Sequence, residues 1–400
     1  MAELNLSIMD RGPDTMTYLK PLLDQFYHQQ NIRVNVNLIG WQNGRSELVR
    51  YAIYHNSPDV SEVGTTWTSD LIAMNALRPF SPNEIESMTQ VGDFLPAAWE
   101  STHLAGKTDT VWSIPWLAES ILVHYRKDLL AKAGLDPSTA FSTLPQFQKT
   151  AEALQAIGIP IPVALPGKNS NTVLLQALAS WIWRFGGDFV STDGKKILLT
   201  SPEAYNGMEA FFNLLKTATV EGLQLLDSLD VYGALHQGYA AIGLGALWLR
   251  NRTEATRPEI YEQLATARIP GIPFVGGSNL VIWRESRREQ AALELVRFLT
   301  SPASQIYYGR GAGMLPTRIK TLNLEDYQSD PAAQAMIESL KAGRPFPSVP
   351  LWGIVEDRLK MALYQVWMSF MRNPNLNLRE TLEQIIGQTA KQLSLTLSQG

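Results

Sequence analysis

The sequence predicts an α/β protein with more than one domain, and three observations lead to this prediction. The chain has 400 residues, which exceeds what one hydrophobic core normally holds. Apolar residues alternate with polar ones over residues 4–8 and again over 32–38, which is the period of a strand. Between them, apolar residues recur at helical spacing from Met16 to Phe26, behind Asp14. Strand, helix and strand in this order indicate a βαβ unit and a parallel sheet.

Polar and aromatic residues follow the ends of these predicted strands. Asp10 and Arg11 follow the first strand, and Trp41 follows the second. A third short strand runs into a polar loop, in which the indole of Trp67 looks exposed and Asp70 supplies a carboxylate. Ligands of parallel sheets bind at the carboxyl ends of the strands. These loops are therefore candidate ligand contacts.

Further helices are expected along the rest of the chain. Their predicted ranges are 124–134, 202–216, 289–299 and a last one at 352–370. Trp181 and Trp183 lie in an apolar stretch and are expected in a core. No linker rich in Pro, Gly or Ser divides the chain, so any boundary between domains must be carried by short crossings.

Composition excludes several classes of function. Hydrophobic residues make up 45% and charged residues 18%, with a formal net charge of −4, which is typical of a globular protein that does not bind nucleic acid. Cysteine is absent, which excludes disulfides, Cys-ligated metals and a thiol nucleophile. The amino terminus lacks the basic and apolar regions of a signal peptide. Two readings stay open: a cytosolic protein, or an exported one from whose sequence a signal or lipoprotein segment has been removed.

Catalytic and cofactor motifs are incomplete. The glycine-rich segments 243–245 and 309–311 each begin the pattern GxGxxG, but neither completes it. The five histidines are scattered, and no pair has the spacing of metal ligands. We therefore expect no enzyme, no cofactor and no metal.

Tryptophan is the residue type that stands out. The chain has 11, and several lie in polar, loop-like settings: Trp41, Trp67, Trp112, Trp116, Trp248 and Trp352. A flat indole packs on the apolar face of a sugar ring, while carboxylates and other polar groups bind its hydroxyls. Each tryptophan has an alternative explanation as a large core residue.

Several segments occur in an order that resembles one family. These are Ser57-Pro58-Asp59-Val60 with the GTTW loop after it, the stretch 112–135 (WSIPWLAES to HYRKDLLAKAGL), Gly186-Gly187-Asp188 with the SPEA of 201–204, the small-residue segment 238–248, and 276–318 with GG, FLTSP and GMLPTR. Together they resemble the family 1 extracellular solute-binding proteins, the maltose- and trehalose-binding group of ABC importers.

The resemblance implies a fold of two discontinuous α/β lobes joined by a hinge. This is the type II architecture of periplasmic binding proteins, with the ligand in the interlobe cleft. The N-terminal lobe would comprise 1–112 plus 277–322, and the C-terminal lobe 113–276 plus 323–400. Crossings would fall near 113–115, 274–276 and 321–326.

The resemblance also implies ligand-binding residues in the first half of the chain. Asp10 and Arg11 would bind sugar hydroxyls, or would serve as turn and N-cap residues. Trp41 would form the floor of the cleft or pack at the sheet edge. The family places a hydroxyl-binding carboxylate and its neighbours where this chain has Thr65, Trp67 and Asp70. Glu119 lies where trehalose-type members have Asp, and it would accept hydrogen bonds from sugar hydroxyls.

In the second half, Trp248 would stack on a sugar ring, and Gly277 and Ser278 occupy a position of backbone contact. Some relatives have Trp where Ser278 stands, so one stacking platform would be missing. Arg310 would be a binding group or a partner in a loop ion pair. Trp352 resembles the aromatic residue that opens the last helix of maltose-type members. Glu356 lies one turn later, where the maltose type has Arg, and this reversal of charge argues against maltose itself.

The function implied is that of an extracytoplasmic receptor for a mono- or disaccharide, or a glucosyl polyol. It would capture the sugar by hinge closure and deliver it to the permease subunits of an ABC transporter. The protein would be monomeric and periplasmic or attached to the cell surface. Two alternatives are a glycoside hydrolase that pairs Glu119 with Asp70 or Glu356, and a receptor for a non-sugar solute.

Overall fold

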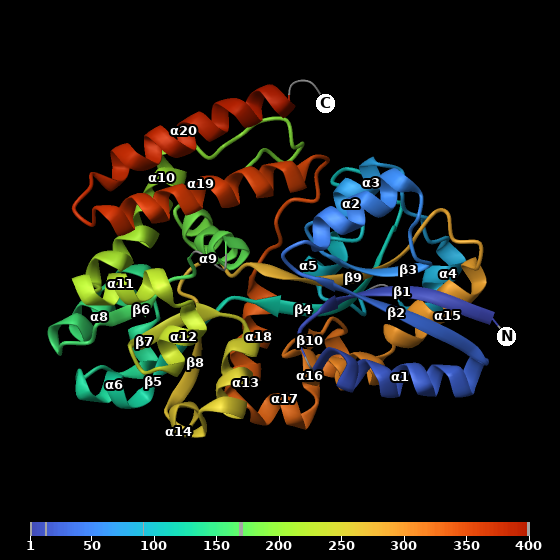
Figure 1. Cartoon of the computed structure of the whole chain (residues 1–400), viewed down its shortest axis with the longest axis horizontal. Coiled ribbons are helices and arrows are strands. Elements are labelled where there is room, and N and C mark those ends of the chain that lie inside the picture. The colour runs from blue at the N-terminus through green and yellow to red at the C-terminus, as the bar shows by residue number, and fades with distance from the viewer. Residues whose placement is uncertain (1, 13, 91, 168–170, 398–400) are drawn as a thin grey trace. The chain divides into compact units, whose positions relative to one another are not determined.

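The computed structural model describes residues 2–12, 14–90, 92–167 and 171–397 (Figure 1). The chain divides into two compact units. Unit 1 is Met1–Glu119, Val275–Ser329 and Pro345–Gly353, and unit 2 is Ser120–Phe274, Asp330–Arg344 and Ile354–Gly400. The two lobes predicted from the resemblance have other bounds, because they place 113–119, 275–276, 323–329 and 345–353 in the C-terminal lobe. A hinge between lobes stays a prediction.

Unit 1 is built on a six-stranded sheet in the order β10-β4-β9-β3-β1-β2. Strand β1 (Ala2–Asp10) pairs in parallel with β2 (Ile32–Gly40) along its whole length, and the two run side by side in Figure 1. It also pairs in parallel with β3 (Val60–Gly64), and β9 (Val275–Ile282) runs antiparallel to β3. The sheet is completed by β4 (Ile114–Ser120) and β10 (Leu315–Pro316), which are antiparallel.

Helix α1 (Asp14–Gln30) joins β1 to β2, which confirms the predicted βαβ unit. Its buried residues Leu19, Leu22, Leu23 and Phe26 recur at helical spacing and pack on the core that holds the apolar face of β1. Helix α2 (Gly44–Tyr54) joins β2 to β3. The parallel strands β1, β2 and β3 therefore present their carboxyl ends at one edge of the sheet.

Unit 2 holds a four-stranded sheet in the order β6-β7-β5-β8. Strand β7 (Ala240–Gly245) is parallel to β6 (Ile161–Ala164) and antiparallel to β5 (Leu122–Arg126), which also pairs with β8 (Leu264–Arg268). Trp181 and Trp183 are buried, as predicted.

One predicted helix is wrong in its first part. Residues 124–126 belong to strand β5, and the helix α6 begins only at Lys127 and ends at Lys132. Leu122, Val123, His124 and Tyr125 are all buried, because β5 is the central strand between β7 and β8. A strand covered on both faces shows no polar alternation, so local periodicity does not reveal it.

The other predicted helices are present. Helix α10 (Pro202–Asn213) continues into a 3-10 turn (Leu214–Thr217), and α15 (Glu289–Leu299) has the predicted bounds. Helix α19 (Trp352–Arg372) is not the last one, because α20 (Leu378–Leu397) follows it.

The remaining helices of unit 1 are α3 (Thr68–Ala73), α4 (Pro82–Met88), α5 (Pro96–Glu100), α16 (Pro302–Ala312), η2 (Ile319–Asn323) and α17 (Glu325–Ser329). Those of unit 2 are α7 (Pro137–Ala140), α8 (Leu144–Ala156), α9 (Asn171–Arg184), α11 (Val220–Ser228), α12 (Val231–His236), α13 (Leu247–Thr256), α14 (Pro258–Tyr261) and α18 (Pro331–Ala342). Within the described part of the chain, none of the helices is both long and apolar enough to cross a membrane.

Candidate functional site

The carboxyl ends of β1, β2 and β3 carry the predicted polar and aromatic residues of unit 1. Asp10 ends β1 in register with Gly40, and Trp41 follows β2. The Oδ1 atom of Asp10 accepts hydrogen bonds from the backbone N–H of Gly12 at 2.9 Å and from the hydroxyl of Thr15 at 3.3 Å. Asp10 thus has the turn role that was one of its two predicted alternatives.

Arg11 is held by a buried glutamate that the sequence reasoning missed. Its guanidinium donates to both carboxylate oxygens of Glu62, which is fully buried in β3, and to the carbonyl of Met9 at 3.0 Å. The same guanidinium carbon lies 5.2 Å from the ring centroid of Trp41 and 5.9 Å from that of Tyr308. Arg11 is therefore a support for the indole of Trp41.

Trp41 and Trp67 pack against each other, with ring centroids 5.5 Å apart. Trp41 is 36% exposed, whereas Trp67 is only 7% exposed. The expectation of an exposed indole at Trp67 is therefore wrong. The physical reason is space beneath the ring: Gly44 and Gly64 contact it, and a Cβ at either position would lie 3.1 Å from a ring atom. Of these two indoles, Trp41 is the accessible one.

Asp70 is engaged by groups of its own unit. Its Oδ2 accepts hydrogen bonds from Arg45 Nε at 2.8 Å and Nη2 at 2.6 Å, and its Oδ1 accepts one from the backbone N–H of Gly353 at 3.2 Å. The carboxylate is 8% exposed. Asp70 thus ties helix α3 to the segment 345–353, and Arg45 is a partner that sequence reasoning missed.

Glu119 differs from Asp70, because no described residue donates a hydrogen bond to its carboxylate. The side chain is half-buried in β4. Burial raises the pKa of Glu119, the positive charge of Arg11 lowers it in part, and Glu62 raises it further. A half-buried carboxylate with free lone pairs gains from hydroxyl donors. The role of Glu119 as an acceptor for sugar hydroxyls stays a prediction.

Thr65, Gly277 and Ser278 lie where strands β3 and β9 pair, and they contribute to the close packing of these strands. The backbone N–H of Thr65 donates to the carbonyl of Gly277 at 3.1 Å. Gly277 has φ +135, and a Cβ there would lie 2.0 Å from the carbonyl oxygen of Leu117, so only glycine fits. Ser278 is fully buried, and its hydroxyl has no hydrogen-bond partner among the described residues.

Three predicted residues late in the sequence have other surroundings. Arg310 forms an ion pair with Asp326, which was one of its two predicted alternatives, and its side chain is half-exposed. Trp352 opens α19 as predicted, but it is fully buried in unit 1, where its ring lies 4.9 Å from that of Phe346. Glu356 is buried and belongs to unit 2.

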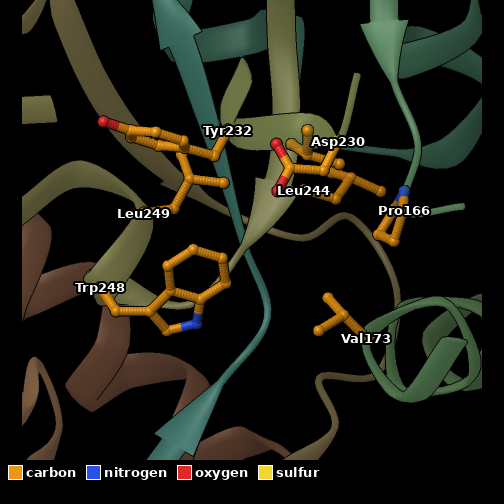
Figure 2. A pocket seen from close by; sticks show the side chains of 8 residues that line it. Pro166, Val173, Asp230, Tyr232, Leu244, Trp248 and Leu249 are labelled. Carbon is orange, nitrogen blue, oxygen red and sulfur yellow. The ribbon is translucent and has the colours of Figure 1, made fainter. Parts of the chain in front are cut away.

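Unit 2 places Trp248 beside a hollow (Figure 2). Trp248 lies in the first turn of α13, just after β7 ends, and is partly exposed. The guanidinium of Arg252 lies 5.9 Å from the Trp248 ring centroid and 5.3 Å from that of Tyr232. Arg252 thus lies against the Trp248 ring, which stays partly exposed.

A buried histidine fixes the turn before Trp248. The Nε2 of His124 lies 3.2 Å from the carbonyl oxygen of Gly245 and 3.1 Å from that of Ala246. Because carbonyls only accept, Nε2 carries the proton, and Nδ1 accepts from the hydroxyl of Thr266 at 3.1 Å. Burial lowers the pKa of His124 to about 4. The residue is therefore a neutral structural group.

Comparison with known proteins places the chain in a family. Residues 11–306 match the profile of the bacterial extracellular solute-binding proteins, and the chain belongs to this family. It is 24% identical over 367 residues to the diacetylchitobiose binding protein of Streptomyces coelicolor, which covers 88% of this chain and 82% of that protein.

Solved structures show the same fold. The maltose-bound MalE3 protein of T. maritima superposes with a TM-score of 0.82 at 22% identity, over 99% of this chain and 100% of that one. A solute-binding protein of Thermotoga lettingae bound with alpha-D-tagatose gives 0.82 at 18% identity, over 98% and 99%. The predicted fold of two α/β lobes and the predicted family are confirmed.

Family membership also settles the class of function. The chain is a solute-binding protein of an ABC importer and not an enzyme. Its family is extracellular, which agrees with the expected periplasmic or surface location.

Proposed function

We propose that this protein is the receptor that captures a small saccharide, a mono- or disaccharide or a glucosyl polyol, and hands it to the permease. One observation carries the proposal. In unit 1, Arg11 lies between two candidate ligand contacts. Its guanidinium contacts the exposed indole of Trp41, and its positive charge lowers the pKa of Glu119, a carboxylate that accepts no hydrogen bond from a described residue. An apolar flat surface beside a hydroxyl acceptor is the pairing that a sugar ring requires.

The predicted site residues then take two kinds of role. Trp41 and Trp248 provide ring faces, and Glu119 accepts hydrogen bonds from hydroxyls. Arg11 and Asp70 act indirectly, because their charged groups are already held by Glu62 and by Arg45. The remaining candidates are Asp10, Thr65, Trp67, Gly277, Ser278, Arg310, Trp352 and Glu356, which we propose shape the site through turns, packing and ion pairs.

The names of similar proteins support a saccharide. One is named for diacetylchitobiose, and others are described as bound to maltose and to tagatose. We propose capture by hinge closure, in which the ligand stabilises the closed form by its higher affinity for that form. The protein would act as a monomer, with an affinity in the micromolar range, roughly −8 kcal/mol.

A thermal-shift screen tests this function. Mono- and disaccharides, glucosylglycerol-like compounds, polyamines and amino acids are compared, with tryptophan fluorescence followed in parallel. A specific sugar should raise the melting temperature, because it binds the folded state and not the unfolded one. Trp41→Ala and Trp248→Ala should each abolish the shift, while Trp99→Ala, outside the proposed site, tests for unspecific loss of fold. A shift with polyamines or amino acids alone would favour the non-sugar alternative.

A further inference from the structure

The chain passes from strand β7 into helix α13 with little local guidance, although Trp248 lies in the first turn of that helix. The residue before the helix is Ala246, whose methyl side chain cannot accept a hydrogen bond from the first N–H groups of the helix. Arg250, in the same turn, places a positive charge near the positive end of the helix dipole. The direction of this turn, and with it that of the Trp248 side chain, must therefore be fixed by contacts from elsewhere in unit 2.

These contacts come from His124 in the neighbouring strand β5. The side chain is fully buried, and its Nε2 donates to the carbonyl oxygens of Gly245 at 3.2 Å and of Ala246 at 3.1 Å. Gly245 is the last residue of β7, and Ala246 is the residue that precedes α13. One donor thus holds both sides of the junction between strand and helix, and a side chain without that donor removes the link.

Thr266 in strand β8 orients the histidine ring. It lies directly opposite His124 in the antiparallel pair of β5 and β8, and its hydroxyl lies 3.1 Å from Nδ1. A neutral imidazole carries one proton, so a hydroxyl that donates to Nδ1 favours the form with the proton on Nε2. The result is a chain of hydrogen bonds across β8, β5 and β7, and its last acceptor, Ala246, is two residues before Trp248.

We propose that His124, oriented by Thr266, is a positioning residue that sets the direction of the Trp248 indole and, through it, the affinity for sugar. This rests on the proposed function, in which Trp248 offers a ring face. The indole forms one wall of the hollow, and Val173 and Pro166 lie across from it (Figure 2). A change in the direction of the first turn of α13 therefore moves the ring face relative to the other residues of the site.

Two amides of different length separate this role from the mere burial of a polar group. The amide nitrogen of a glutamine comes closest to the position of Nε2, whereas that of an asparagine comes closest to Nδ1. His124→Gln should therefore keep the donation to the two carbonyls, and His124→Asn should lose it. His124→Leu removes every donor. Thr266→Val removes the hydroxyl that orients the ring and leaves the histidine in place, and Thr266→Ser keeps the hydroxyl.

Fluorine NMR of protein labelled with fluorotryptophan reports on the indole directly and needs no sugar. Trp248→Phe assigns the resonance of Trp248, and Trp41→Phe assigns that of Trp41, the internal control in unit 1. His124→Asn and His124→Leu should shift or broaden the Trp248 resonance and leave that of Trp41 unchanged. His124→Gln and Thr266→Ser should keep both resonances, and Thr266→Val should shift that of Trp248 by a smaller amount.

Isothermal titration calorimetry measures the consequence for binding, with maltose, N,N′-diacetylchitobiose and D-tagatose as probes. For the probe that the wild type binds most tightly, His124→Asn and His124→Leu should weaken binding by about tenfold or more, and His124→Gln by less than about threefold. His28→Leu is the matched control, because it makes the same change at an exposed histidine of α1, and its affinity should equal that of the wild type.

The outcomes separate this proposal from the proposed function. An unchanged Trp248 resonance in His124→Asn and His124→Leu would overturn the positioning role, and so would equal effects of His124→Gln and His124→Asn. A shift of Trp41 as large as that of Trp248 would also overturn it, because it indicates a general loss of fold. Unchanged affinity in a variant with a shifted Trp248 resonance would overturn the link to binding. If the wild type itself binds no sugar, the proposed function fails, while the resonances still decide whether His124 directs the indole.

Discussion

Some residues of unit 1 expose a side chain that a ligand can contact, and others hold that side chain in place. Glu62 belongs to the second kind, because it anchors Arg11, on which the indole of Trp41 rests. A buried guanidinium that loses its carboxylate partner is left with an uncompensated charge.

Glu62→Gln should therefore lower the free energy of unfolding by about 3 kcal/mol or more, and should alter the fluorescence of Trp41. Urea unfolding measures the first effect. Glu47→Gln is the matched control, since Glu47 pairs with Arg50 on the surface, and its loss should cost less than about 1 kcal/mol. Equal stability of Glu62→Gln and wild type would show that the pair does not hold the site.

Glu119→Gln should make the protein more stable at neutral pH and weaken its binding of sugar. Because burial raises the pKa of Glu119 in the folded state, its ionised form opposes folding. Below the ordinary carboxyl pKa, the side chain is protonated in both states and no difference from the Gln variant is expected. As pH rises through the raised pKa, the wild type loses stability relative to the variant. Melting temperatures at pH 4 and 7.5 measure this, and a variant that is less stable at pH 7.5 would contradict it.

The sequence predicts Glu119 but not Glu62, and the reason is local. Glu119 lies in a segment that resembles the family, whereas a glutamate is seldom fully buried, so Glu62 reads as an ordinary polar residue. One signal was available: Ser61-Glu62 interrupts the apolar strand between Val60 and Val63. The burial of Trp67 is not evident from its own loop, because Gly44, one of the two glycines that make room for its ring, lies in α2, 23 residues earlier.

At the scale of elements, glycine allows two strands of unit 1 to approach. Gly277→Ala should destabilise the protein by about 3 kcal/mol or more, because the new Cβ meets the carbonyl of Leu117 and the backbone has positive φ. Gly40→Ala is the control, since a Cβ there has no atom within 4 Å and should cost less than about 1 kcal/mol. Chemical denaturation of both variants distinguishes them, and equal stabilities would refute the close approach.

The turn between β7 and Trp248 should be sensitive to acid through His124. Its pKa of about 4 lies below the ordinary value of 6.5, so its contribution to stability is present above pH 6.5 and is lost as the pH falls towards 4. The loss between pH 7 and 4.5 should be about 2 kcal/mol larger for the wild type than for His124→Gln. Urea unfolding at both values measures it. Parallel pH profiles of the two proteins would be the contrary result.

Element prediction succeeded where one face of an element is exposed. Strand β2 alternates and α1 shows a helical stripe, so both were predicted. Strand β5 is buried on both faces, and the helix predicted at 124–134 wrongly includes its last three residues, 124–126. Such elements are defined by their neighbours in the sheet, which local sequence does not contain.

At the scale of the whole molecule, composition and segment order were sufficient for fold class and family. The bounds of the compact units were not predictable, since they depend on contacts distant in sequence. The hydrogen bond from Gly353 to Asp70 joins positions 283 residues apart and helps to hold the segment 345–353 in unit 1. The hollow in unit 2 likewise gathers residues from separate segments.

The most direct test of the central claim is a titration calorimetry measurement of a saccharide panel, followed by recovery of the bound ligand and its analysis by mass spectrometry. We expect one sugar class to bind with one molecule per chain, at a dissociation constant of roughly micromolar, and to be recovered unchanged. Absence of binding by every sugar, or recovery of cleaved sugar, would contradict the proposal of a saccharide receptor.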